Sequence, residues 1–213
     1  MYYQQLGEIP HKRHTQYRQP DGSLYAEELV SSKGFSGVYS NLYHIHPPTR
    51  VSRIGESKSV EVKLHKDYGL KQTHLKTSQI QSTGGDFLSG RKIFLKNADV
   101  AIGLCYPDET DMPYYYKNAE ADELLYIHEG EGILYSQMGK LTIRKGDYVV
   151  IPRTVIYRLE WKTNNVRMLV VESASPIETP RRYRNELGQL LEHSPYCERD
   201  IRPPEELFTE REK

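Results

Sequence analysis

The residues with the most suggestive metal-binding spacing in this chain are His44 and His46, which flank a single isoleucine. Alternate side chains of a β-strand point to the same face, so a His-x-His pair sets two imidazoles side by side. A metal site needs further ligands, but the position where a carboxylate would be expected holds Arg50, and two prolines directly after His46 end any strand. Structural or surface histidines are therefore the favoured interpretation.

A second pattern is built around a carboxylate. Glu123 is followed after six residues by Gly130, and Gly146 is followed after five residues by Pro152. These are scaffold positions of the two sequence blocks of metal-binding cupins, in which three imidazoles and one carboxylate converge on a divalent cation. Each match is weak alone, but together they favour a cupin barrel.

The imidazole positions of both blocks hold other residue types. The slots fall on Tyr116 and Asn118, or on Lys117 and Ala119 with the shorter spacing, in the first block, and the second block has Thr154 for its glycine, Tyr157 for its histidine and Trp161 for its asparagine. One remaining carboxylate does not hold iron or zinc. The sequence therefore predicts that this barrel contains no catalytic, cofactor-binding or metal-ligating residue.

Other candidate groups have simpler interpretations. The basic cluster His11–His14 is too short for a nucleic-acid arm and is expected to be a solvated or interface patch. Cys105 and Cys197 lie far apart without metal spacing and are expected to be unpaired thiols. His128 lies at a predicted strand end and is expected to be structural, and Gly84-Gly85 is a turn signal rather than a phosphate loop.

The elements that position these residues are predicted to be short strands. Runs rich in Ile, Val, Leu and Tyr recur between residues 91 and 175 and are separated by turn signals, which is typical of an antiparallel sandwich or barrel. The predicted fold class is mostly β: a cupin (double-stranded β-helix or jelly-roll) barrel with a long N-terminal arm of short strands and loops. The expected strands are Lys92–Leu95, Val100–Tyr106, Glu123–His128, Ile133–Ser136, Leu141–Arg144, Tyr148–Ile151, Val155–Trp161 and Val166–Glu172.

Three regions of the sequence differ in composition and in hydrophobic periodicity. Residues 1–90 are predicted to form an arm with edge strands, including a short piece at Val60–Leu64, and such an arm must pack on a core or on another subunit. Residues 91–175 are predicted to form the metal-free barrel. Residues 176–213 are charged and punctuated by prolines and are predicted to be a connector or tail, with a short helix at Asn185–Glu192 that Asn185 would cap.

Charge and hydropathy limit the partners. The chain has 29 basic and 29 acidic residues, so no general attraction to nucleic acid or to an anionic membrane is expected. Its apolar runs are strand-sized, and its first residues do not resemble a secretion signal. A cytoplasmic protein is the expectation.

Specific segments add a resemblance that spacing cannot supply. The chain resembles the N-terminal half of homogentisate 1,2-dioxygenases, in particular the bacterial branch. The similar segments are Gly7–Gln16, Ser23–Leu29 with the following Gly34-Phe35, Leu42–Pro48, Tyr135–Val150 and Arg184–Pro203.

The resemblance implies a bicupin enzyme of tyrosine and phenylalanine catabolism that opens the ring of homogentisate with O2. It further implies an Fe(II) ion that is held by the C-terminal cupin half, and assembly into trimers and hexamers. No residue of this chain matches the iron-binding motif. The implied role of this half is structural support and oligomerisation, with the C-terminal half or other subunits as partners and no activity alone.

Two alternatives remain open. A free-standing, metal-free cupin that binds a small ligand or a protein is suggested by tyrosines expected to line a cavity: Tyr116, Tyr126, Tyr135 and Tyr157. A metal-independent isomerase-type cupin would need a His–Asp pair inside the barrel, and no histidine is expected on an inward-facing strand position.

Overall fold

The computed structural model describes residues 16–31, 33–36, 39–59, 62, 72–204, 206–207 and 209–210. Strands dominate these residues, and the helical elements are three short 3-10 turns at Thr77–Gln79, Arg181–Tyr183 and Glu198–Asp200. No helix within the described ranges has the length and apolar character needed to cross a bilayer. The predicted strand at Val60–Leu64 lies almost entirely outside the described residues.

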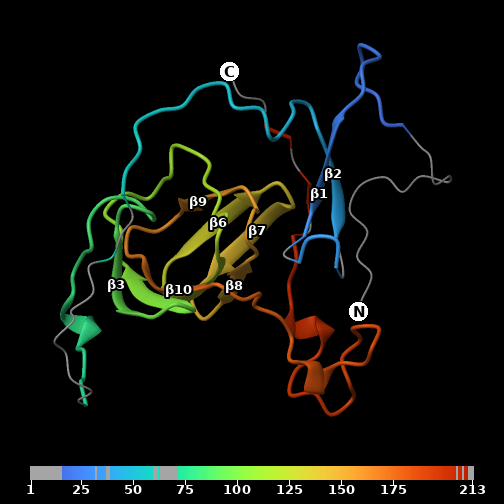
Figure 1. Ribbon diagram of the computed structural model, residues 1–213. Coiled ribbons are helices and arrows are strands. Elements are labelled where there is room, and N and C mark those ends of the chain that lie inside the picture. The colour runs from blue at the N-terminus through green and yellow to red at the C-terminus, as the bar shows by residue number, and fades with distance from the viewer. Residues whose placement is uncertain are drawn as a thin grey trace.

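Two facing antiparallel sheets form the body of the molecule (Figure 1). The larger sheet has the strand order β3-β4-β10-β5-β8, and the smaller has the order β7-β6-β9. This arrangement confirms the predicted mostly β, cupin-type barrel. The strands are β3 Arg91–Lys96, β4 Val100–Cys105, β5 Asp122–Glu129, β6 Glu131–Ser136, β7 Gly139–Arg144, β8 Tyr148–Ile151, β9 Tyr157–Trp161 and β10 Arg167–Ser173.

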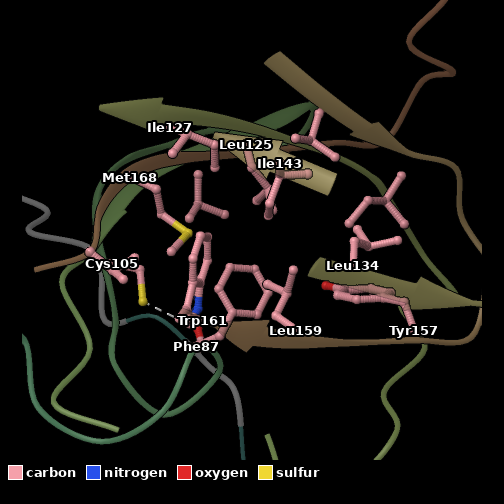
Figure 2. Close-up of a cluster of buried hydrophobic side chains, with 14 of the residues drawn as sticks. Phe87, Cys105, Leu125, Ile127, Leu134, Ile143, Tyr157, Leu159, Trp161 and Met168 are labelled. Atoms are coloured by element: carbon pink, nitrogen blue, oxygen red, sulfur yellow. Dashed lines mark hydrogen bonds between the residues drawn. The ribbon is translucent and has the colours of Figure 1, made fainter. Parts of the chain in front are cut away.

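All eight strands expected from the sequence are present, with ends that differ by a few residues. They form because apolar residues alternate with polar ones, so each strand can bury one face. In β9, for example, Tyr157, Leu159 and Trp161 are buried and the two residues between them are partly exposed. The side chains that meet between the sheets fill the barrel (Figure 2).

The N-terminal arm contributes a separate two-stranded sheet. Strands β1, Ala26–Val30, and β2, Ser40–His44, pair antiparallel and lie beside the barrel (Figure 1). An ion pair of 2.6 Å joins Lys33 of this hairpin to Glu178 of the connector. Because an isolated hairpin is marginally stable in water, this contact with the C-terminal region helps to hold the arm in place.

The predicted helix at Asn185–Glu192 is wrong. The segment forms a tight turn in which the Asn185 side chain accepts hydrogen bonds from the backbone N–H groups of Leu187 and Gln189, both at 2.9 Å. Gly188 adopts a left-handed conformation (φ 84°), which a regular helix cannot include. Asparagine side chains compete with helical hydrogen bonds in this way. Asn185 therefore does bond to the backbone N–H groups that follow it, as a helix cap would, but it stabilises a turn.

Candidate functional site

The carboxylate found by motif spacing lies inside the barrel. Glu123 is on β5 and shares the inward face of that strand with Leu125 and Ile127, and all three are fully buried. Directly opposite Glu123 in the register of β5 and β10 is Glu172. Two carboxylates in a cross-strand pair repel one another, so this position requires a cation.

That cation is the guanidinium of Arg91, the first residue of β3. Its Nη1 donates to Glu123 Oε1 at 2.5 Å and to Glu172 Oε1 at 2.6 Å. The exposed fractions of the three side chains are 9% for Arg91, 1% for Glu123 and 30% for Glu172. Arg91 therefore bridges one fully buried and one partly exposed carboxylate.

A tyrosine hydroxyl completes the cluster. Tyr157 donates to Glu123 Oε2 at 2.6 Å and accepts a hydrogen bond of 3.2 Å from Arg91 Nη2. Tyr157 stands where the second cupin block has a metal-binding histidine, and Glu123 stands at the carboxylate position of the first block. The structure thus brings together two positions that the motif spacing had related only through the sequence.

The protonation states follow from burial and charge. Burial raises the pKa of the Tyr157 hydroxyl well above its ordinary value, so the hydroxyl stays protonated and donates to Glu123. Burial alone would lower the pKa of Arg91, but the neighbouring Tyr157 and Glu123 raise it above its ordinary value. The guanidinium therefore remains charged in the barrel interior.

Aromatic rings enclose the guanidinium. The Arg91 guanidinium carbon lies 4.2 Å from the ring centroid of Phe87 and 5.7 Å from that of Tyr116. The Tyr116 ring in turn contacts that of Tyr157 edge-on at 5.6 Å, and burial raises the pKa of Tyr116 to about 12. Cation–π contacts of this kind stabilise a desolvated positive charge. We call Arg91, Glu123, Glu172 and Tyr157 the Arg91 cluster.

The donor set of the Arg91 cluster does not fit Fe(II). An iron site of the two-histidine, one-carboxylate type needs imidazoles and open positions, whereas both carboxylates here bind a guanidinium. Within the described ranges, no group of three or more His, Cys, Asp and Glu side chains is placed to hold a metal ion. The absence of a metal site in this barrel stays a prediction.

The other positions of the two motif blocks serve the scaffold. Asn118 is partly buried, and its side chain accepts hydrogen bonds from the backbone of the turn that follows it. Trp161 is packed in the core. Thr154, which replaces the motif glycine, has a φ of 70°, a left-handed conformation that is unfavourable for a β-branched residue.

The His-x-His pair lies outside the barrel, at the end of β2. His44 Nε2 lies 2.8 Å from Glu28 Oε2 on the neighbouring strand β1, so a carboxylate does stand beside it, although none follows in the sequence. His46 is not part of this contact. His44 and Glu28 thus form a cross-strand pair, and the structural interpretation of the two histidines stays a prediction.

Two of the four tyrosines expected to line a cavity do not face the barrel interior, which corrects that prediction. Tyr126 lies on the outer face of the large sheet against Tyr148, with ring centroids 4.7 Å apart. Tyr135 is stacked by Arg158, whose guanidinium lies 4.1 Å from its ring, on the outer face of the small sheet. Strand alternation places both residues opposite to their buried neighbours.

Sequence reasoning missed Arg91 and Glu172 as members of the central cluster. Charged residues in strands are usually solvent-exposed, so neither stood out. A signal was nevertheless present, because Glu172 has the same strand parity as the buried Met168 and Val170. A charge at an inward position predicts a buried partner, but its identity depends on the register between strands that are distant in the sequence.

Comparison with known proteins decides the family. Residues 5–183 match the family described as "Homogentisate 1,2-dioxygenase N-terminal". The chain belongs to this family. The homogentisate dioxygenase N-terminal assignment predicted from the sequence is thereby confirmed, and the barrel with its Arg91 cluster is the fold of this domain.

A curated relative supports the same assignment. A protein of Saccharolobus solfataricus named "Putative dioxygenase" is 40% identical over 204 residues, which cover 96% of this chain and 52% of the relative. The chain therefore spans about half the length of this relative.

Two solved structures are similar to part of this chain. A protein of Neisseria meningitidis is 21% identical, with 39% of this chain and 81% of that chain covered and a TM-score of 0.34. A cupin-2 domain protein of Shewanella frigidimarina is 19% identical, with 39% and 78% covered and a TM-score of 0.35.

Proposed function

We propose that this homogentisate dioxygenase N-terminal domain is a metal-free support for a second cupin barrel, which holds Fe(II) and carries out aromatic ring cleavage. The proposed substrate is homogentisate, as the family description suggests. The domain alone is then inactive, and its role is structural support and oligomerisation.

The observation that carries this proposal is the Arg91 cluster. A single guanidinium binds both carboxylates, the buried Glu123 at 2.5 Å and the partly exposed Glu172 at 2.6 Å, so the oxygens that it contacts are not free to bind a divalent cation. Because the internal charge is supplied by the chain itself, the barrel can fold without a metal. A rigid, metal-independent barrel is suited to position a neighbouring catalytic domain.

The length of the S. solfataricus relative gives the proposal its second half. Since 204 matched residues make up 52% of that protein, its remaining part has room for another barrel. We propose that this type of second half supplies the iron ligands.

Oxygen uptake tests whether this domain is inactive alone and supports the activity of the second half. This chain, the unmatched half of the S. solfataricus relative, and a mixture of both are incubated with Fe(II) and homogentisate under an oxygen electrode. We expect no uptake from this chain alone, and uptake from the mixture that exceeds that of the relative's half alone. Homogentisate-dependent uptake by this chain alone, at a rate proportional to its concentration and not to added free iron, would overturn the proposal.

A further inference from the structure

The two sheets of the barrel have four edge strands, and among the described residues the edges of the small sheet are covered. The C-terminal tail lies along β7, where Lys140 N–H donates to the carbonyl of Glu206 at 3.0 Å. A segment before β5 lies along β9, where Tyr116 and Tyr157 exchange backbone hydrogen bonds of 2.8 and 2.9 Å. Covered edges cannot pair with a strand of another chain.

The edge strand β3 of the large sheet is protected differently. It carries Lys92 and Lys96, and its pairing with β4 shifts register between Ile93 and Leu95. Lysines and bulges are two devices by which edge strands resist pairing with other chains.

The fourth edge, β8, has no lysine. Its residues Tyr148–Ile151 include no charge and pair with β5 in regular register, and the bulge in this pairing, where Gly146 and Asp147 both bond to Ile127, lies before the strand begins. Ile127 N–H donates to the carbonyl of Asp147 at 2.9 Å. Because hydrogen-bonded pairs alternate along antiparallel strands, Val149 and Ile151 bond to β5. The backbone groups of Tyr148 and Val150 point away from β5, to an edge that no other strand covers among the residues that the structure describes.

The outer side chains of β8 are also unusually apolar for their exposure. Tyr148 is 69% exposed and Val150 is 43% exposed. The apolar surface continues onto β5, where Tyr126 stacks on Tyr148 and Leu124 is the cross-strand neighbour of Val150. An apolar surface beside open backbone groups is suited to another β-strand.

We propose that β8 pairs antiparallel with β8 of a second copy of this chain, which joins the two large sheets into one continuous sheet across a two-fold axis. With Val149 on the axis, Tyr148 faces Val150 of the partner subunit, so the open backbone groups meet as hydrogen-bonded pairs. Aromatic and β-branched residues are favourable cross-strand partners. This inference deepens the oligomerisation part of the proposed function and rests on it.

The uncharged sequence of β8 is the argument for a second copy as the occupant. A two-fold axis brings each side chain close to its own counterpart, so any charge near the axis would repel itself. The four residues of β8 present none, whereas β3, the other edge of the same sheet, has two lysines.

Two proline variants separate the interface from the fold. Val150→Pro removes an N–H that points to the open edge, which an edge strand tolerates, whereas Val149→Pro removes an N–H that binds β5. We expect a wild-type mass of twice 24.8 kDa, or a multiple of it, by size-exclusion chromatography with light scattering. Val150→Pro halves this mass and keeps cooperative thermal unfolding, while Val149→Pro lowers the unfolding temperature.

A charge provides a second, independent variant. Val150→Lys adds the protective lysine that β8 lacks and also halves the mass, and Leu95→Lys on β3, a matched exposed position, leaves the mass unchanged. An assembly that is unaffected by both Val150 variants overturns the β8 interface but not the oligomerisation role. A wild-type chain that is monomeric at its highest soluble concentration, and also after 100-fold dilution, overturns both the β8 interface and the oligomerisation role.

Discussion

Replacing Arg91 by methionine tests the central cluster most informatively. Methionine keeps a long side chain over Phe87 but removes the charge, which leaves Glu123 buried opposite Glu172 without a countercharge, although the hydrogen bond from Tyr157 remains. Breaking a buried ion pair from one side costs about 3–5 kcal/mol. For a chain of this size, this corresponds to a decrease in the unfolding temperature of roughly 6–20 °C, which differential scanning calorimetry measures directly.

The double variant is the control for charge. Glu123→Gln in the Arg91→Met background removes the buried anion, so we expect it to recover part of the lost stability, and a double-mutant cycle gives the coupling energy. If Arg91→Met costs less than about 1 kcal/mol at pH 7, the value typical of an exposed pair, the guanidinium does not hold the barrel together.

Further predictions concern other parts of the chain. Thr154→Gly relieves the left-handed strain of Thr154 and should raise the free energy of unfolding by up to about 1 kcal/mol in urea melts, whereas a loss of stability would show that φ 70° is not strained. Burial raises the pKa of the Cys105 thiol to about 12, so a thiol reagent should modify one cysteine of the folded chain at pH 8 and none in Cys197→Ser; rapid labelling of both in the native state would contradict this. Burial opposes the charged form of Asp86, but hydrogen bonds from Ser89 and Tyr114 lower its pKa overall. The stability that this lowered pKa gives is present above the unfolded value near 4 and is lost as the pH falls through the folded pKa. Asp86→Asn should therefore flatten the decrease of the unfolding temperature at acid pH, and an unchanged decrease would refute the assignment.

The strands could be predicted because their signal is local. Alternation along β5, β9 and β10 marks inward positions without knowledge of neighbouring strands. The spacing of the two motif blocks also singled out Glu123 and Tyr157, which are hydrogen-bonded at 2.6 Å inside the barrel.

The partners of Glu123 could not be predicted in the same way. Arg91 reaches it from a strand 32 residues earlier, and Glu172 faces it from a strand 49 positions later, so both contacts depend on sheet order and register. The turn at Asn185 was mistaken for a helix because asparagine caps helices and turns by the same hydrogen bond. The outward-facing Tyr126 and Tyr135 show that the residue type alone does not predict which face of a strand lines the interior, whereas the alternation of buried and exposed residues along the strand does.

Iron content tests the central claim most directly. The chain is incubated anaerobically with Fe(II), dialysed against a chelator and analysed for bound metal by mass spectrometry, with Arg91→Met in parallel. The account predicts that the wild-type chain retains no stoichiometric iron, because the Arg91 guanidinium occupies the carboxylates that a metal would need. One iron per wild-type chain that survives dialysis and is lost on Glu123→Gln would contradict it.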